Sequence, residues 1–381
     1  MSVAQQEPKS ELTSSGVERR TIVLSGVTLR ESGSVVVFRE ALASLEREFG
    51  DQFEIVALVK SRELFDTPRV RYIEFPWIVN SWFARLYFEY WLARGISNKL
   101  KPKLWLSMHE TSPNVSADVR AVYCHNVAEL YRATPTEFLL DWRFGMFTLF
   151  FRWIHRINIR KNRFVIVQAD WIRKIFEFTY GIRNIVVAPP QISAVGVRQN
   201  VESSASARPF RFFYPLVPRP YKNVEVCLQA ARMLEDSGFN NFELWLTMDG
   251  NTNKYASHVA KMFPDVRTVR WLGTVPRQRV MELYAEVDCL LFPSRLEASP
   301  LPVGEFKQFG KPMLLADLPY AHESAAGHPE ACFFNPSAAE RLAELMIKAA
   351  KGEPIFERVP ELKIDPPYVR NWSELWKLML E

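Results

Sequence analysis

The chain has 381 residues, of which 48% are hydrophobic and 24% charged. This length is about two and a half times that of a usual single domain, so two domains are expected. The hydrophobic share excludes disordered, collagen-like and low-complexity classes. A formal net charge of +5 is too small and too scattered to indicate nucleic-acid binding, which needs a concentrated basic face.

The N-terminal residues 1–20 are polar and mixed in charge, so we expect a disordered tail and no secretory signal. The longest apolar runs are far shorter than the roughly 20 residues that span a bilayer. Four cysteines are spread along the chain without a close pair, which argues against a disulfide framework and a zinc ribbon. The sequence therefore predicts a cytoplasmic protein with buried thiols.

The first half of the chain alternates short apolar strands with helical stretches. Residues 21–27 form a β-branched apolar run, and residues 34–50 have the periodicity of a helix that ends at a glycine. Residues 54–59 then predict a second strand, so the chain opens with a βαβ unit and a parallel sheet is expected. Further strands are predicted at 103–109, 121–126, 163–169 and 184–190.

A domain linker is predicted at residues 193–209, where Ser, Ala, Gln and Asn accumulate without periodicity. The same alternation then restarts, which indicates two Rossmann-like doubly wound α/β domains, at 21–195 and 196–360, facing a central cleft. Ligands of such domains bind at the carboxyl ends of the strands. The strands expected in the second domain are 210–216, 242–250, 266–273, 287–294 and 311–317, with helices at 223–236, 253–263, 277–286 and 302–309.

Residues 289–311 form the most informative stretch. A buried strand ends at Ser294, a loop holds Glu297, and a predicted helix carries Glu305, with seven residues between the two carboxylates. The helix would point its free N–H groups at the cleft, which suits a phosphate or diphosphate. A carboxylate early in the helix can accept hydrogen bonds from ribose hydroxyls. Composition alone leaves another interpretation open, in which both glutamates are simply solvated.

These residues resemble the retaining glycosyltransferases of the GT-B fold, glycosyltransferase family 4, whose hallmark is a pair of glutamates separated by seven residues after an FPS strand end. The segments WLGTV (271–275), FGKPML (309–314) and AHESAAG (321–327) resemble further motifs of the family, in the same order. The resemblance is strong over residues 210–335. It implies transfer of a sugar from a GDP- or UDP-activated donor to a glycan or lipid-linked acceptor, with retention of configuration, in surface polysaccharide synthesis.

The resemblance also implies roles for individual residues. Glu297 would position the sugar and Glu305 the ribose, while Lys222 matches the lysine that holds the donor diphosphate. The family's arginine lies five residues before that lysine, where this chain has Val217, so Arg219 is the candidate instead.

The helix that carries Glu305 departs from the family at its start, where Ser299 and Pro300 replace a common Phe-Gly pair. Proline has no N–H, so Leu301 is left to supply any backbone contact to the donor. Thr274 and Val275 match the loop that follows the family's nucleobase strand.

In the first domain, His125 resembles the family's strand-end histidine that faces the transferred sugar. The alternative for His125 is a half-buried side chain satisfied by the backbone, and His109 is a weaker candidate of the same kind. Gly33 fits a loop that lets a helix N-terminus approach the donor phosphates or the acceptor, although a simple turn would use the same residue. The final residues, 361–381, have an apolar helical face, and in GT-B proteins such a helix crosses back to the first domain.

No Asp-x-Asp motif and no helical histidine pair is present, so a metal site is not expected and the nucleotide-sugar is the only co-substrate implied. An aromatic and basic stretch, 142–164, suits peripheral contact with an anionic inner membrane face. Its alternative is a core helix with a basic solvent face, and the aromatic run at 75–93 is equally open. Two other functions also stay open: a nucleotide-sugar epimerase or hydrolase of this fold, and a non-catalytic nucleotide-sugar binding protein.

Overall fold

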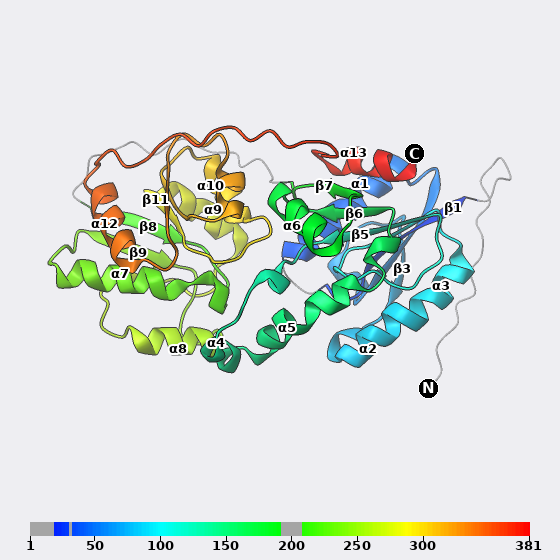
Figure 1. The fold of residues 1–381 in the computed structure, drawn as a ribbon, viewed down its shortest axis with the longest axis horizontal. Coiled ribbons are helices and arrows are strands. Elements are labelled where there is room, and N and C mark those ends of the chain that lie inside the picture. The colour runs from blue at the N-terminus through cyan, green and yellow to red at the C-terminus, as the bar shows by residue number, and fades with distance from the viewer. Residues whose placement is uncertain (1–18, 30–32, 192–207) are drawn as a thin grey trace.

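The computed structural model describes residues 19–29, 33–191 and 208–381. Two parallel β-sheets, each covered by helices, make up the body of the molecule (Figure 1). The first sheet has seven strands in the order β3-β2-β1-β4-β5-β6-β7, and the second has six in the order β10-β9-β8-β11-β12-β13. Both orders start in the middle of the sheet and grow outward in two directions. The predicted fold class, two Rossmann-like doubly wound domains, is therefore confirmed.

The first sheet consists of β1 (Arg20–Gly26), β2 (Phe53–Val59), β3 (Arg71–Glu74), β4 (Leu104–Ser107), β5 (Val119–Cys124), β6 (Phe164–Val167) and β7 (Ile185–Val187). The second consists of β8 (Phe210–Tyr214), β9 (Phe242–Leu246), β10 (Val269–Trp271), β11 (Cys289–Phe292), β12 (Met313–Ala316) and β13 (Ala331–Phe334). Most of these strands are continuous apolar runs buried on both faces, which is the pattern of parallel strands covered by helices on either side.

The helices packed on the first sheet, or projecting from it, are α1 (Gly33–Phe49), α2 (Trp82–Tyr87), η3 (Phe88–Leu92), α3 (Ala93–Leu100), α4 (Pro135–Leu140), α5 (Trp142–Arg156) and α6 (Asp170–Tyr180). Those of the second domain are η6 (Pro220–Lys222), α7 (Val224–Asp236), α8 (Lys254–Met262), α9 (Arg277–Glu286), α10 (Leu301–Lys307), α11 (Pro319–Ala325) and α12 (Ala339–Ala350), and the chain ends in α13 (Trp372–Leu380).

Several element limits differ from the sequence prediction. β1 begins at Arg20, so the predicted tail 1–20 extends too far, and its first 18 residues lie outside the described part of the chain. The predicted linker 193–209 also lies outside it except for its last two residues. The edge strands β3 and β13 and the helix α12 had no counterpart in the prediction. Edge strands are short and half-exposed, which weakens their apolar signal.

The last segment of the chain returns from the second domain to the first, where α13 lies beside α1 (Figure 1). Trp372, Leu375, Trp376 and Met379 form the buried face of α13 and join the core of the first domain. A backbone bridge between Val187 and Tyr368 fixes the segment before this helix. The C-terminal segment therefore ties the two domains together.

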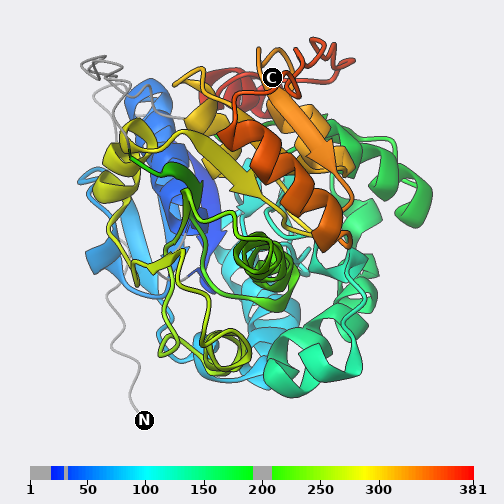
Figure 2. The ribbon, with the colours of Figure 1, turned by 90° about the vertical axis from the view of Figure 1, so that its left-hand side faces the viewer.

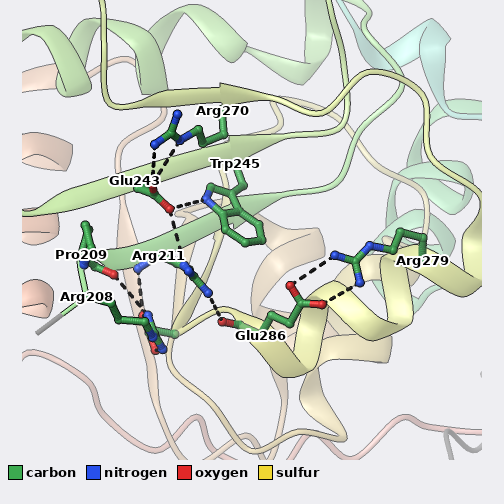
Figure 3. A network of polar contacts seen from close by, with 9 residues as sticks. Arg208, Pro209, Arg211, Glu243, Trp245, Arg270, Arg279 and Glu286 are labelled. Carbon is green, nitrogen blue, oxygen red and sulfur yellow. Dashed lines mark hydrogen bonds and ion pairs between the residues drawn. The ribbon is translucent and has the colours of Figure 1, made fainter. Parts of the chain in front are cut away.

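A network of ion pairs lies at the amino ends of the strands in the second domain (Figure 3). Glu243 pairs with Arg270 at 2.9 Å and with Arg211 at 3.5 Å, and the Arg211 guanidinium lies over the ring of Trp245. Arg208 forms two 2.7 Å bonds with Asp288. Since ligands of doubly wound sheets bind at the opposite, carboxyl ends, we assign this network to stability alone.

Candidate functional site

A cavity of about 1270 Å³ lies between the two domains, at the carboxyl ends of strands from both sheets. From the first domain it is lined by residues that follow β1, β4, β5, β6 and β7, and from the second by residues that follow β8 and β11. The doubly wound topology places the strand ends of both domains at this one site.

Glu297 lies in the loop between β11 and α10 and lines this cavity. Its Oε1 atom accepts a 2.5 Å hydrogen bond from Lys222 Nζ and one of 2.6 Å from the Ser294 hydroxyl. Burial by itself would lower the pKa of Lys222, but the Glu297 carboxylate and Tyr221 outweigh burial and raise that pKa. The pair is therefore a charged lysine and carboxylate held at the rim of the second sheet.

Arg219 is the N-cap residue of η6 and lines the cavity, and its Nη1 atom donates a 2.6 Å hydrogen bond to Asp141 Oδ2 of the first domain. Asp141 also caps the N-terminus of α5 by accepting from the Phe144 N–H. Val217, at the family's arginine position, is 65% exposed. Arg219 is thus a half-exposed cation that reaches across the domain interface close to Lys222.

The start of α10 faces the start of α1 across the cavity. A Cβ added to Gly33 would lie 3.9 Å from Leu301 Cδ1, and both residues line the cavity together with Ser299. Pro300 is the N-cap residue of α10, and its carbonyl accepts from the N–H groups of Val303 and Gly304. The structure therefore brings these candidate residues to one place, where Leu301 offers the first N–H of the helix.

Glu305 does not line the cavity. Its side chain is 7% exposed on α10, where Oε1 accepts from Arg277 at 2.7 Å and Oε2 from the Tyr284 hydroxyl at 3.2 Å. Burial raises the pKa of this carboxyl, and the Arg277 charge opposes the rise. Thr274 and Val275 lie in the loop that leads into α9, the helix that carries Arg277, and Thr274 is exposed.

His125 directly follows β5 and lines the cavity from the first domain. Gln168, which follows β6, donates a 3.3 Å hydrogen bond to His125 Nδ1, and the Tyr123 ring packs 4.7 Å from the imidazole. Burial lowers the pKa of His125 to about 4, so the ring is neutral at pH 7. A neutral imidazole at this place can exchange hydrogen bonds with a sugar hydroxyl.

His109, the weaker sequence candidate, is fully buried and lies in a polar network. Its Nε2 atom is 3.0 Å from the Ser25 hydroxyl, and its Nδ1 is 3.0 Å from the Thr111 hydroxyl and 3.1 Å from Glu89 Oε1. With both ring nitrogens engaged inside the first domain, we assign His109 to structure.

Sequence reasoning missed several polar residues at this site. Glu110 follows His109, lines the cavity and has a left-handed φ of 67°, a conformation that is costly for a residue other than glycine. Burial raises the pKa of Glu110, although Arg85 lies 3.9 Å away. Gln168 and Asp141 were also missed. A polar residue directly after an apolar strand was the only available signal for Glu110 and Gln168.

The segment 321–327, which resembles a motif of the family, forms a contact between the domains. Glu323 of α11 accepts hydrogen bonds from the backbone N–H groups of Asp170 at 2.6 Å and Trp171 at 2.9 Å, at the start of α6 in the first domain. Trp171 Nε1 also donates to the Ala298 carbonyl at 3.3 Å, next to Glu297. This contact therefore sets the position of the Glu297 loop against the first domain.

Glu323→Ala is expected to loosen this contact, because two charge-assisted hydrogen bonds and a favourable helix-dipole interaction are lost, in total about 2 kcal/mol. Hydrogen exchange at the amides of Asp170 and Trp171 should accelerate by about tenfold or more. Glu330→Ala, an exposed glutamate of the same domain, is the matched control. Equal exchange in both variants would show that Glu323 does not hold the domains.

An unusually apolar surface flanks the cavity, formed by α2, η3 and α5. We call it the aromatic face; both views place α5 near α2, and the rings of Trp82 and Phe147 lie 6.0 Å apart (Figures 1 and 2). The exposed side of α5 carries large apolar side chains as well as Arg143, Arg152 and Arg156, so the basic solvent face of the alternative interpretation is present but mixed with apolar side chains. The half-exposed or exposed members are Trp82, Phe83, Tyr87, Trp91, Trp142, Met146, Leu149, Phe150 and Trp153.

Within residues 19–29, 33–191 and 208–381, no group of three or more His, Cys, Asp and Glu residues is placed to hold a metal ion. In the same part of the chain, every helix is too short or too polar to cross a membrane.

Residues 201–361 match the family model described as glycosyl transferases group 1. A glycosyltransferase from Rickettsia africae is similar in structure, with a TM-score of 0.62, 15% identity and coverage of 87% of this chain and 88% of that one. WaaG, a glycosyltransferase involved in lipopolysaccharide biosynthesis, is similar with a TM-score of 0.63 and 16% identity, and the match covers 87% of this chain and 90% of that one. Anabaena HepE, solved with UDP and glucose, has a TM-score of 0.56 and 11% identity, and the match covers 86% of this chain and 89% of that one. No curated protein sequence matches the chain.

The similar structures place the fold among the GT-B glycosyltransferases. The match to the family model supports sugar transfer as the activity. The family model covers the second domain, which carries Glu297, Lys222 and Arg219.

Proposed function

We propose that the protein is a retaining glycosyltransferase, which moves a sugar from a GDP- or UDP-activated donor to a glycan or lipid-linked acceptor in surface polysaccharide synthesis. The observation that carries this proposal is a cavity between the domains that is lined both by Glu297, paired with Lys222, and by the first-domain residue His125. The match of residues 201–361 to a glycosyltransferase model supports it. So do the neighbours, one of which was solved with UDP and glucose.

The donor would lie along the second domain. Lys222 and Arg219 are the two cations that can take the developing charge on the diphosphate, and the Leu301 N–H can add a backbone hydrogen bond. To bind the diphosphate, each cation would exchange its carboxylate partner for phosphate oxygens. Glu305 would accept the ribose hydroxyls after Arg277, which is half-exposed, moves aside.

The sugar would lie between Glu297 and His125. When the bond from the anomeric carbon to the diphosphate breaks, the acceptor hydroxyl attacks the same face and its proton passes to a diphosphate oxygen. The Oε1 atom of Glu297 is held by both Lys222 and Ser294 and is poorly suited to act as a free nucleophile, which favours this same-face route over a covalent glycosyl-enzyme intermediate. A neutral His125 can position the sugar without adding charge.

Transfer should continue in excess EDTA, because cationic side chains and not a metal ion would neutralise the leaving group. The measurement is nucleotide release from a panel of UDP- and GDP-sugars, with and without an acceptor lipid extract. Release that depends on the acceptor supports the transferase. Release without any acceptor indicates a hydrolase, and complete loss in EDTA that manganese restores would contradict metal independence.

We further propose that the aromatic face contacts the inner face of a membrane. Aromatic side chains at half-exposed positions beside arginines suit the interface of an anionic bilayer, where each basic residue contributes about 1 kcal/mol. The exposed side of α5 carries Arg143, Arg152 and Arg156, and residues 142–164 contain no aspartate or glutamate.

In flotation with vesicles, the protein should be recovered with phosphatidylglycerol and much less with phosphatidylcholine, and raised salt should release it because ions screen the attraction. The double variant Arg152→Glu, Arg156→Glu should lose most of this recovery. Equal recovery with neutral and anionic vesicles, or none with either, would refute the electrostatic contact.

A further inference from the structure

The cavity described above has two chemically different ends. Its inner end, between the sheets, is polar and holds His125, Gln168 and Glu297. Its outer end runs between α2 and α5 and is lined mainly by Trp82, Met146 and other apolar side chains of the same two helices. We call this outer end the apolar arm.

The apolar arm leaves large apolar side chains in contact with water. Phe83 is 84% exposed, Phe150 53% and Trp82 48%, although all three line the same cavity. Exposed apolar clusters of this kind mark binding surfaces, because burying them against an apolar partner is favourable. A sugar or nucleotide would gain little from such walls, whereas a hydrocarbon chain would gain along its whole length.

The charges of the lining point to an anionic group near the apolar arm. The carboxylates of the lining each have a cation close by: Glu110 lies 3.9 Å from Arg85, Asp141 2.6 Å from Arg219 and Glu297 2.5 Å from Lys222. Arg143, an exposed residue of α5, is a lining cation with no ion-pair partner among the residues that the structure describes. Arg143 is therefore available for a phosphate.

We propose that the acceptor is a lipid-linked sugar, with its sugar beside the donor sugar at the polar inner end, its phosphate near Arg143, and its hydrocarbon chain in the apolar arm. This inference rests on the proposed glycosyltransferase function and selects the lipid-linked acceptor over a free glycan. The polar end, the unpaired Arg143 of the lining and the apolar arm supply the three kinds of contact that such a molecule needs. Trp82, Phe83 and Phe150 belong both to the aromatic face and to the lining of the cavity, so the hydrocarbon chain can enter from a membrane.

Chain binding is tested without any donor by using dodecyl phosphate as a probe, below the concentration at which it forms micelles. A brominated chain should quench tryptophan fluorescence, and Trp82→Phe with Trp142→Phe should remove most of the quenching. Lengthening the chain should tighten binding by up to about fourfold per methylene. Inorganic phosphate should bind much more weakly than the dodecyl ester, and quenching that is insensitive to both substitutions would overturn the proposal.

Matched variants distinguish binding in the apolar arm from non-specific adsorption to apolar surface. Phe150→Asp should weaken the binding of dodecyl phosphate at least tenfold. Phe178→Asp, at a 92% exposed site outside the cavity, should leave the affinity unchanged. Leu149 lies on the same helix but outside this cavity, so Leu149→Asp should also leave the affinity unchanged. Equal losses in Phe150→Asp and Leu149→Asp would mean that the helix meets only a membrane surface or a protein, which overturns the chain site.

Different results would refute the lipid-linked acceptor and the glycosyltransferase function on which it rests. Transfer to a water-soluble glycan with no dependence on chain length would refute the lipid-linked acceptor and leave the transferase intact. Specific quenching by the brominated chain, together with no transfer from any nucleotide-sugar to any lipid, would support the apolar site and refute the transferase. Melting curves of all variants identify any that fail to fold, and Phe150→Ala then replaces the aspartate variant.

Discussion

Lys222→Ala is expected to lower kcat by about a hundredfold to a thousandfold, the loss that follows removal of one group that stabilises charge in a transition state. Lys222 is held 2.5 Å from Glu297 and carries its charge in a site that is largely shielded from water, where a cation acts strongly on a diphosphate. Steady-state kinetics with the best nucleotide-sugar of the panel measure the effect. Affinity for the free nucleoside diphosphate should also fall.

Two further variants show whether Lys222 acts on the donor or only on Glu297. Lys222→Arg keeps the charge and should recover part of the lost turnover. Glu297→Gln removes the partner of Lys222, so it should impair transfer while leaving nucleoside diphosphate affinity unchanged or slightly higher. A folded Lys222→Ala protein with full turnover, or one whose only defect is a lower melting temperature, would assign the lysine to structure.

The parts of this fold that could be predicted are those whose signal is local in the sequence. β11 and the loop after it are an apolar run followed by Pro293, Ser294 and Glu297, and nothing distant is needed to recognise them. The alternation of buried strands and helices is also local, because each strand of a parallel sheet is apolar throughout. For that reason both doubly wound domains could be predicted.

What could not be predicted depends on contacts between distant segments. Glu323 is an ordinary helix residue in the sequence, and only the packing of α11 on α6 turns it into a cap of another domain. Arg277 and Tyr284 bond to Glu305 from α9, which no spacing rule would indicate. The aromatic face is a further case, since periodicity finds the apolar side of α5 but not whether that side meets the core or the solvent.

The hydrogen bonds that Glu305 already makes reduce the loss of nucleotide affinity expected when this residue is replaced. In a free helix the carboxylate would offer both oxygens to ribose, but here Arg277 and Tyr284 already occupy them. Binding a nucleotide would therefore exchange one charged hydrogen bond for another, and the net gain is smaller than the gross strength of the new bonds. The half-exposed Arg277 is the partner that can leave, while Tyr284 is fully buried.

Glu305→Ala is accordingly expected to weaken UDP or GDP by about tenfold to a hundredfold, within the 1.5–3 kcal/mol of one hydrogen bond to a charged group. Calorimetry with whichever nucleotide raises the melting temperature most is the measurement. Glu305→Gln, which keeps the side-chain shape and a hydrogen-bond acceptor for Tyr284, controls for damage to the fold. Arg277→Ala should raise the affinity for the nucleotide if the ribose hydroxyls take the place of Arg277 at Glu305. Unchanged affinity in Glu305→Ala would instead mean that the carboxylate only anchors α9 to α10, and that the ribose binds elsewhere in the cleft.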